Sequence, residues 1–272
     1  MTIIFRMKTK EAHRIKVLAE LLSSNIKTGC FVIDERGMSL TMMDQNKTIL
    51  LDMMLIAENF SVYKLTTKKI HLGINLNFFQ KMLKSVKKKD SLEFFIDDKA
   101  PNDLAIQVIP KENNRVSTSY LKIQNVQNLE IDIPTGYTKP IIVSSGEYQK
   151  IIKDMCNIGT IVKVNAKNQS IEFNCNAGGI LKRNVKFGEE DDGDIPEKDK
   201  IEYNQEFLTE QLVRITKLSG LSTNMKIFPG KPLLFRSEIG TIGTISIYIK
   251  SKEQIESENY NTVIESDYES DC

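Results

Sequence analysis

The stretch SSGEYQKIIKD, residues 144 to 154, predicts the beginning of a helix whose exposed side carries lysines. Ser144 and Glu147 have the spacing of a capping box, in which each side chain accepts a hydrogen bond from a backbone N–H that the helix leaves unpaired. The predicted buried face consists of Ile151, Ile152, Met155 and Ile158. Lys150 and Lys153 fall on the opposite face. A single lysine-bearing face is usually only a solvated surface, so the stretch has to be compared with the rest of the chain.

The same plan occurs earlier in the chain. Residues 5–15, FRMKTKEAHRI, align with residues 141–151, IIVSSGEYQKI, at an offset of 136. Residues 30–43, CFVIDERGMSLTMM, align with residues 161–174, IVKVNAKNQSIEFN, at an offset of 131. The difference between the two offsets predicts that the loop from the helix to the next strand is five residues longer in the first half. A period of this length indicates two copies of one domain rather than a solenoid.

Each half is predicted to contain two helices and eight or nine antiparallel strands, because short alternating runs are separated by polar turns. Besides the helix at 144, helices are expected over residues 9–24, 75–90 and 205–220. Their predicted buried residues are Ile15, Leu18, Leu22, Leu76, Phe79, Met82, Leu83, Val86, Leu208, Leu212 and Ile215. All four predicted helices carry a pair of cations on the side opposite these buried residues. If the helices cover one side of a sheet, these cations face outward, and a polyanion is the natural partner.

Composition excludes several classes of protein. The chain has 272 residues, of which 40% are apolar and 27% charged, as in ordinary globular domains. No apolar run approaches the roughly 20 residues of a membrane span, and the first residues lack a secretory signal, so we expect an intracellular protein that is not secreted. The four cysteines are scattered and the two histidines have no ligand-spaced neighbours, so no metal or cofactor is expected.

An enzyme is not expected either. The chain contains no GxxxxGK[ST], GxGxxG or GxSxG motif. A carboxylate-dependent nuclease could use Asp97, Asp98 or Asp103, but these residues lie in a predicted turn and lack a second acidic cluster.

Charge is distributed unevenly along the chain. Residues 253–272 hold seven acidic residues and no lysine or arginine, whereas the rest holds 37 basic and 29 acidic residues, a net charge of +8. The acidic tail and the acidic insertion at 189–200 contain few apolar residues, and both are predicted to be disordered.

From about residue 1 to residue 252 the sequence resembles a sliding clamp of the proliferating cell nuclear antigen family. The resemblance is carried, in this order, by GMSLTMMDQNKTIL (37–50), LEIDIPTGY (129–137), SSGEYQKIIKDMCNIG (144–159), KPLLFRSE (231–238) and TISIYIK (244–250). It implies an α+β protein with the DNA clamp fold: two similar domains, each with antiparallel sheets outside and two helices lining a central channel.

The resemblance also implies a division of the chain. It predicts an N-terminal clamp domain at 1–116, a connector with an interface strand at 117–137, a C-terminal clamp domain at 138–252, and a tail at 253–272. Three subunits would form a ring around duplex DNA, loaded by a clamp loader. The DNA-facing residues would be Lys10, Arg14, Lys81, Lys84, Lys88, Lys150, Lys153, Arg214 and Lys217.

Two protein surfaces follow from the same resemblance. A pocket for short peptides with a glutamine and paired aromatics, from DNA polymerase and other proteins, would consist of Met43, Lys47, Leu50, Ile131, Ile133, Pro134, Pro232 and Tyr248. Subunits would pair through the residues Ser117, Ser119, Tyr120 and Lys122 of one copy and Gly178, Ile180, Lys182 and Val185 of the next. The implied location is the nucleus or a viral DNA replication compartment, with no membrane partner.

Two alternatives remain open from the sequence. A monomeric processivity factor would hold DNA by electrostatics on an open face, and a subunit of a heteromeric checkpoint-type clamp would pair with different chains. Both share the two-domain fold, and edges that pair with a second copy look the same as edges that pair with another protein.

Overall fold

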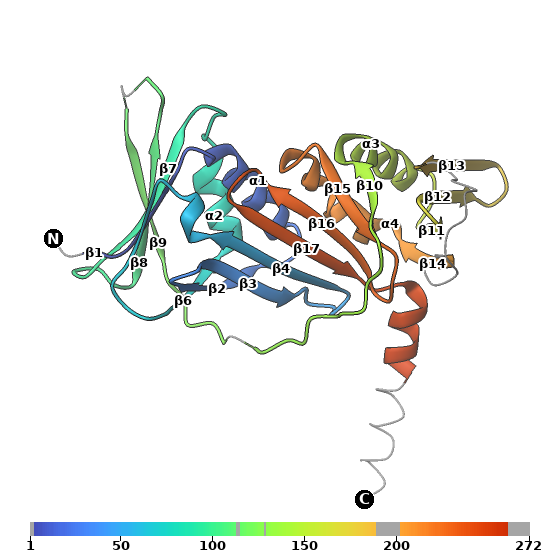
Figure 1. The fold of residues 1–272 in the computed structure, drawn as a ribbon, viewed down its shortest axis with the longest axis horizontal. Coiled ribbons are helices and arrows are strands. Elements are labelled where there is room, and N and C mark those ends of the chain that lie inside the picture. The colour runs from blue at the N-terminus through green and yellow to red at the C-terminus, as the bar shows by residue number, and fades with distance from the viewer. Residues whose placement is uncertain (1–2, 113–114, 128, 189–201, 261–272) are drawn as a thin grey trace, which may run out of the picture. The chain divides into compact units, whose positions relative to one another are not determined.

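The computed structural model describes residues 3–112, 115–127, 129–188 and 202–260 (Figure 1). The chain forms two compact units. Unit 1 comprises residues 1–132, 220–222 and 237–246, and unit 2 comprises residues 133–219, 223–236 and 247–272. The predicted acidic insertion at 189–200 lies outside the described residues.

Unit 1 contains most of the first repeat. Its elements are β1 (Ile3–Thr9), α1 (Ala12–Ser23), β2 (Thr28–Asp34), β3 (Gly37–Met43), β4 (Ile49–Ile56), the 3-10 turn η1 (Ala57–Asn59), β5 (Val62–Leu65), β6 (Ile70–Asn75), α2 (Leu76–Leu83), β7 (Ser91–Asp97), β8 (Asp103–Ile109) and β9 (Ser117–Lys122). One antiparallel sheet has the order β5-β1-β7-β8-β9. In the other sheet the strands follow the order β4-β3-β2-β6, and α1 packs against α2.

Unit 2 contains most of the second repeat. Its elements are β10 (Ile141–Ser144), α3 (Ser145–Cys156), β11 (Ile161–Lys167), β12 (Ser170–Ala177), β13 (Leu181–Phe187), β14 (Glu202–Leu208), α4 (Thr209–Arg214), the 3-10 turn η3 (Thr216–Gly220), β15 (Asn224–Phe228), β16 (Leu233–Ile239) and β17 (Gly243–Ile249). Strands follow the orders β13-β12-β11-β14 and β10-β15-β16-β17, and α3 packs against α4. The end of β16 and the beginning of β17 belong to unit 1.

The two repeats have the same topology. The order β4-β3-β2-β6 corresponds to β13-β12-β11-β14, and β1-β7-β8-β9 corresponds to β10-β15-β16-β17. The first residues of α1 and α3, of β2 and β11, and of α2 and α4 are each 133 positions apart. The predicted five-residue difference between the helix-to-strand loops is therefore wrong, because residues 24–27 and 157–160 form loops of equal length.

Each unit has its own apolar interior. In unit 2 the fully buried Tyr148 of α3 packs against Phe173 of β12 and Phe235 of β16, with ring centroids 5.8 and 5.5 Å apart. Its hydroxyl donates a hydrogen bond to the carbonyl of Leu212 at 3.3 Å, so the buried polar atom is satisfied. Burial raises the pKa of Tyr148, and the hydroxyl stays protonated. This interior determines which side of α3 faces solvent.

Two helices are shorter than the sequence pattern predicts. Helix α2 ends at Leu83, so Val86 is buried beyond the helix and Lys88 lies in the following loop. The second helix of the second repeat begins only at Thr209, because residues up to Leu208 extend β14 along β11. Strand pairing there prevails over the helical spacing of the apolar residues.

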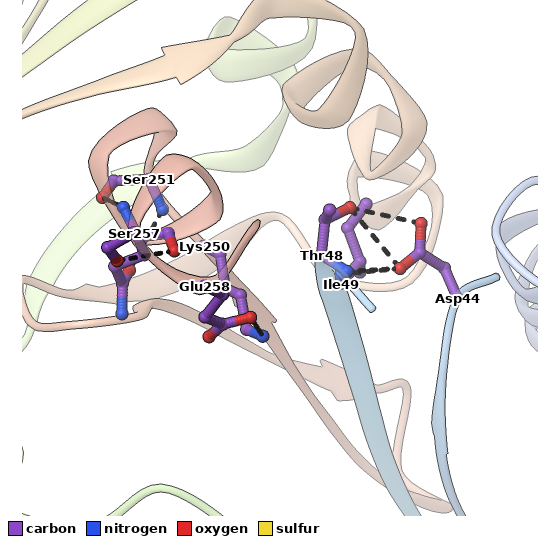
Figure 2. A network of polar contacts seen from close by, with 8 residues as sticks. Asp44, Thr48, Ile49, Lys250, Ser251, Ser257 and Glu258 are labelled. Carbon is purple, nitrogen blue, oxygen red and sulfur yellow. Dashed lines mark hydrogen bonds and ion pairs between the residues drawn. The ribbon is translucent and has the colours of Figure 1, made fainter. Parts of the chain in front are cut away.

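The beginning of the acidic tail is ordered, contrary to the expectation of disorder from residue 253. Residues 252–260 form a helix, and Ser251 and Gln254 form a reciprocal capping box with N···O distances of 3.1 and 3.3 Å. Lys250 also pairs with Glu258 at 2.5 Å (Figure 2). Residues 261–272 lie outside the described residues.

Candidate nucleic-acid interface and assembly surfaces

The outward side of α2 in unit 1 carries two exposed lysines. The Lys81 ammonium lies 5.4 Å from the centroid of the exposed Phe78 ring, a cation–π contact that orients it. Lys84 is the C-terminal cap residue of the helix. Lys16 of α1, which the sequence pattern did not single out, donates to the carbonyls of Lys84 and Val86 at 2.7 and 3.1 Å. The end of α2 is therefore surrounded by positive charge, as the helix dipole favours.

The outward side of α1 is less uniform than predicted. Lys10 precedes the helix and is exposed. Arg14 is only partly available, because its guanidinium donates to the carbonyl of Gly220 and lies 3.6 Å from the Glu11 carboxylate. Arg14 thus joins α1 to the turn at Gly220 within unit 1, and its role is structural as well as electrostatic.

Helix α3 presents Lys150 and Lys153 to solvent. One half of the predicted capping box is present, since the Ser144 hydroxyl accepts from the N–H of Glu147 at 3.4 Å. The Glu147 carboxylate pairs with Lys150 at 2.9 Å, and this hydrogen bond raises the pKa of Lys150. An exposed ion pair of this kind contributes little to stability, so Lys150 can exchange the carboxylate for a phosphate at small cost.

The remaining predicted cations lie at the ends of helical segments. Arg214 is the last residue of α4 and is half-buried, Lys217 is exposed in η3, and Lys88 is exposed beyond α2. Long flexible cations of this kind bind phosphate oxygens without reading bases. The helical segments of both units can therefore bind a polyanion without sequence preference.

The strands predicted to join subunits are both edge strands. Among the described strands, β9 pairs with β8 alone, and β13 pairs with β12 alone. Gly178, with a φ of 58°, and Ile180 lie in the turn before β13, whereas Lys182 and Val185 lie within the strand. Ser117, Ser119 and Lys122 lie on β9, where Lys122 pairs with Asp103 at 2.8 Å.

These edges also expose apolar side chains. Tyr120 of β9 is 63% exposed, Ile180 is 94% exposed and Leu181 is 52% exposed. Unpaired strand edges with exposed apolar groups are templates for pairing with another chain.

The predicted peptide-pocket residues are divided between the units. In unit 1, Met43 is half-buried, Lys47 is exposed, Leu50 is buried and Ile131 is half-buried. In unit 2, Ile133 is 42% exposed, Pro134 and Pro232 are half-buried, and Tyr248 is 3% exposed. Leu50 and Tyr248 thus contribute mainly to the interior, while Ile133 offers apolar surface.

Tyr137, at the end of the segment LEIDIPTGY, was not singled out by its sequence context. Its hydroxyl donates to the carbonyl of Pro232 at 2.8 Å, and its ring lies 6.0 Å from that of Tyr248. Burial raises the pKa of Tyr137 far above its usual value. This contact fixes the end of the connector within unit 2.

The turn between β3 and β4 is organised by one buried carboxylate (Figure 2). Asp44 is 4% exposed, and its Oδ1 accepts from the N–H groups of Thr48 and Ile49 at 2.7 and 2.9 Å. Lys47 adopts a φ of 56°, which is unusual for a residue with a Cβ. The carboxylate holds this turn in place.

Replacing Asp44 with asparagine is expected to lower the free energy of unfolding by about 1–3 kcal/mol, because two charge-assisted hydrogen bonds to a buried acceptor weaken. Differential scanning calorimetry should show a Tm lower by about 2–4 °C for each kcal/mol. Asp52→Asn is the control, since Asp52 is half-buried on β4 and accepts one hydroxyl bond from Thr41 at 2.9 Å. Equal shifts in the two variants would contradict the role of Asp44.

The architecture places this chain in a defined class of protein. Two repeats of one strand order, each with outward cations on its helices, make up the DNA clamp fold. A solved structure with this fold, proliferating cell nuclear antigen from Entamoeba histolytica, superimposes with a TM-score of 0.81 over 92% of this chain and 100% of that chain, at 20% identity.

Family models identify the chain more closely. The model described as proliferating cell nuclear antigen, N-terminal domain, matches residues 4–132, and the model for the C-terminal domain matches residues 132–252. The chain belongs to the proliferating cell nuclear antigen family.

Two curated relatives cover nearly the same length. The proliferating cell nuclear antigen of Chaetomium thermophilum is 27% identical over 253 residues, which cover 90% of this chain and 96% of the relative. A protein of Paramecium bursaria Chlorella virus 1 named probable DNA polymerase sliding clamp 1 is 24% identical over 254 residues, which cover 91% and 96%. Among the described residues, none of the helices is long and apolar enough to cross a membrane.

Proposed function

We propose that this protein is a DNA sliding clamp that acts as a processivity factor for a DNA polymerase. The observation that carries the proposal is the set of exposed cations on α2 of the first repeat and α3 of the second, in a chain of the proliferating cell nuclear antigen family. Its relatives include a protein named as a DNA polymerase sliding clamp. The protein works as a scaffold rather than by chemical catalysis.

Three copies form the ring, through β9 of one copy and β13 of the next. The topology supports this pairing, because β17 is the counterpart of β9 and β4 is the counterpart of β13. The beginning of β17 belongs to unit 1 and lies beside β4 there, so close that a Cβ at Gly243 would be 2.1 Å from the Met54 carbonyl oxygen. Pairing of β9 with β13 between copies repeats this arrangement, hides both edges and closes the ring.

Enclosure, rather than affinity, keeps the ring on DNA. Lysine and arginine contacts with phosphates are independent of sequence and exchange readily. Lys81, Lys84, Lys150 and Lys153 can therefore pass from one phosphate to the next while the ring translocates. Lys10, Arg14, Arg214 and Lys217 contribute to the same electrostatic surface, with Arg14 constrained by Glu11.

The partner surface lies at the connector. Ile131 and Ile133 alternate beside Pro134 in a segment without regular secondary structure, and Ile133 is 42% exposed. Apolar groups in such a segment form a docking site for short peptides with a glutamine and paired aromatics, carried by the polymerase and other replication proteins. A clamp loader opens the ring, and the site of action is the nucleus or a viral replication compartment.

The proposed enclosure is tested on a linear duplex fixed to a surface at one end. Purified protein threads over the free end, which is then blocked with a bulky protein, and the surface is washed at high salt. We expect the blocked duplex to retain the protein and the open duplex to lose it, since salt removes electrostatic contacts but not a topological link. Equal loss from both would contradict enclosure and favour a monomer that binds DNA on an open face.

A further inference from the structure

Unit 1 contains a strongly basic surface hollow beyond the end of α2, and Lys88 is the one predicted DNA-facing residue that lines it. The hollow has a volume of about 720 Å³ and lies between residues 85–90, which follow α2, and residues 108–112 and 115–117, at the end of β8 and the beginning of β9. Its cationic lining residues are Lys87, Lys88, Lys89, Lys111 and Arg115. All five are exposed. We call this set the basic hollow.

The acidic residues at the basic hollow do not neutralise it. Asp90 is 6% exposed, and its Oδ2 accepts a hydrogen bond from the N–H of Lys87 at 2.8 Å. This carboxylate therefore stabilises the backbone of the loop. Glu112 is the other acid in the lining. Among the described residues, none of the five cations of the basic hollow forms an ion pair. Several like charges around one hollow repel one another, and an anion relieves that repulsion.

The charge of the basic hollow affects the pKa of a histidine on helix α1. His13 of α1 has a lowered pKa, first because it is desolvated and then because Lys16, Lys88 and Arg14 repel its charged form, with Glu20 opposing them. Lys16 in turn bonds to the carbonyls of Lys84 and Val86 at the end of α2. Lys16 of α1, the end of α2 and Lys88 of the basic hollow therefore lie close to one another within unit 1.

We propose that the basic hollow binds phosphates of the DNA backbone and extends the DNA-facing surface beyond the end of α2. This inference rests on the proposed function. The lining favours a phosphate backbone over an acidic peptide, because its apolar members, Val108 and Pro110, are buried or half-buried and offer no anchor pocket. Lysine and arginine side chains around an open hollow suit repeated, exchangeable phosphate contacts.

The basic hollow also bears on how the protein slides. A DNA strand that contacts Lys81 or Lys84 and the basic hollow at once is held at two positions on unit 1. Both sets of contacts are electrostatic, so the hold weakens steeply as salt rises. The basic hollow thus increases residence on DNA without fixing a sequence register.

The test compares two variants with the same change in charge. The hollow variant is Lys87→Gln, Lys88→Gln and Lys89→Gln, and the control is Lys64→Gln, Lys68→Gln and Lys69→Gln, three exposed lysines of β5 and the following turn. Fluorescence anisotropy measures the affinity for a short linear duplex between about 50 and 200 mM salt.

For the hollow variant we expect the slope of log K against log salt to become less steep by about 0.9 for each phosphate that the protein no longer neutralises. If two or three phosphates are released in this way, the affinity at the lowest salt falls about tenfold or more. The control variant is expected to bind as the unmodified protein does.

His13 supplies a second readout that does not depend on affinity. The chain has two histidines, so the isotope-labelled imidazole of His13 can be titrated by NMR. Lys88→Gln is expected to raise the pKa of His13, because one repelling charge is removed. Duplex bound to the unmodified protein is expected to raise it also, because phosphate neutralises the same charge.

The outcomes separate this inference from the proposed function. An unchanged slope in the hollow variant, with a reduced slope in a variant lacking Lys81 and Lys84, would overturn the basic hollow as a DNA site and leave the clamp intact. Unchanged slopes in both would overturn DNA binding by unit 1 altogether. If the hollow variant kept its DNA slope but no longer bound a synthetic peptide of residues 253–272, the basic hollow would be a site for acidic peptide, and the inference would be wrong.

Discussion

Replacing Lys81, Lys84, Lys150 and Lys153 together with alanine is expected to reduce the affinity for duplex DNA at least about tenfold at low salt and to make its salt dependence less steep. These four lysines are exposed on α2 and α3, where they can reach phosphates. Each phosphate that is no longer neutralised lowers the steepness of the salt dependence by about 0.9 in log–log terms. Fluorescence anisotropy with a short linear duplex measures both quantities, and primer extension measures the decrease in processivity.

Folding should survive this change. Alanine has the highest helix propensity, and the ion pair that the substitutions remove, Lys150 with Glu147, is at the surface. Glu147 remains in the first turn of α3, where the helix dipole favours a negative charge. Weaker DNA binding together with an unchanged Tm would therefore identify an electrostatic effect.

The control for this variant removes four exposed lysines from strands and turns, at Lys64, Lys68, Lys69 and Lys226. It makes the same change in net charge. A comparable decrease of affinity in both variants would show that net charge, and not the helix surface, determines binding. Unchanged processivity in the helix variant would contradict the assignment of α2 and α3 to DNA.

Replacing Ile180 with aspartate is expected to convert the proposed ring into monomers. Ile180 is 94% exposed in the isolated chain, in the turn directly before the edge strand β13, and the proposed pairing of β13 with β9 covers it. Removing this apolar side chain costs about 1.5–3 kcal/mol at each interface, and an unpaired buried carboxylate costs more. Every interface of the ring contains the substitution, so the effects accumulate.

Light scattering coupled to size exclusion measures the outcome. The unmodified protein is expected at about three times 31.0 kDa, and the Ile180→Asp variant near 31.0 kDa. Ile142→Asp is the matched control, because Ile142 is 64% exposed on β10, an edge strand outside the proposed interface. A monomeric mass for the unmodified protein would favour the open-face alternative or a heteromeric ring. A trimeric mass for the Ile180→Asp variant would place the interface elsewhere.

The sequence patterns correctly predicted that the chain contains two copies of one domain, but they gave the wrong offset between the copies. The alignments at 136 and 131 detect the duplication, while the structure has one offset of 133 for the paired helices and strands. Apolar periodicity identifies faces and not ends, so a shift of a few residues leaves the pattern almost unchanged. Sheet pairing fixes the register, because each residue has a defined partner across the strand.

At the candidate DNA surface, too, the sequence pattern did not predict where a helix ends or which groups a cation contacts. Lys88 shares the helical spacing of Lys81 and Lys84, yet α2 ends at Leu83 and Lys88 lies in the loop that forms part of the basic hollow. Arg14 has the spacing of an outward cation, yet it bonds to the carbonyl of Gly220, a residue 206 positions away. No local pattern contains the information for such a contact.

The sequence by itself determined the class of this protein: two similar α+β domains, cations on the outward side of each helix, and membership in a family whose motifs recur in a fixed order. Those features are local or repeated, and propensity, spacing and charge specify them directly. The tertiary structure decided which cations are exposed and which are held by neighbouring groups, that β9 and β13 are edge strands, and that segments distant in sequence form the basic hollow. Long-range packing brings these groups together, and its geometry depends on the whole chain at once.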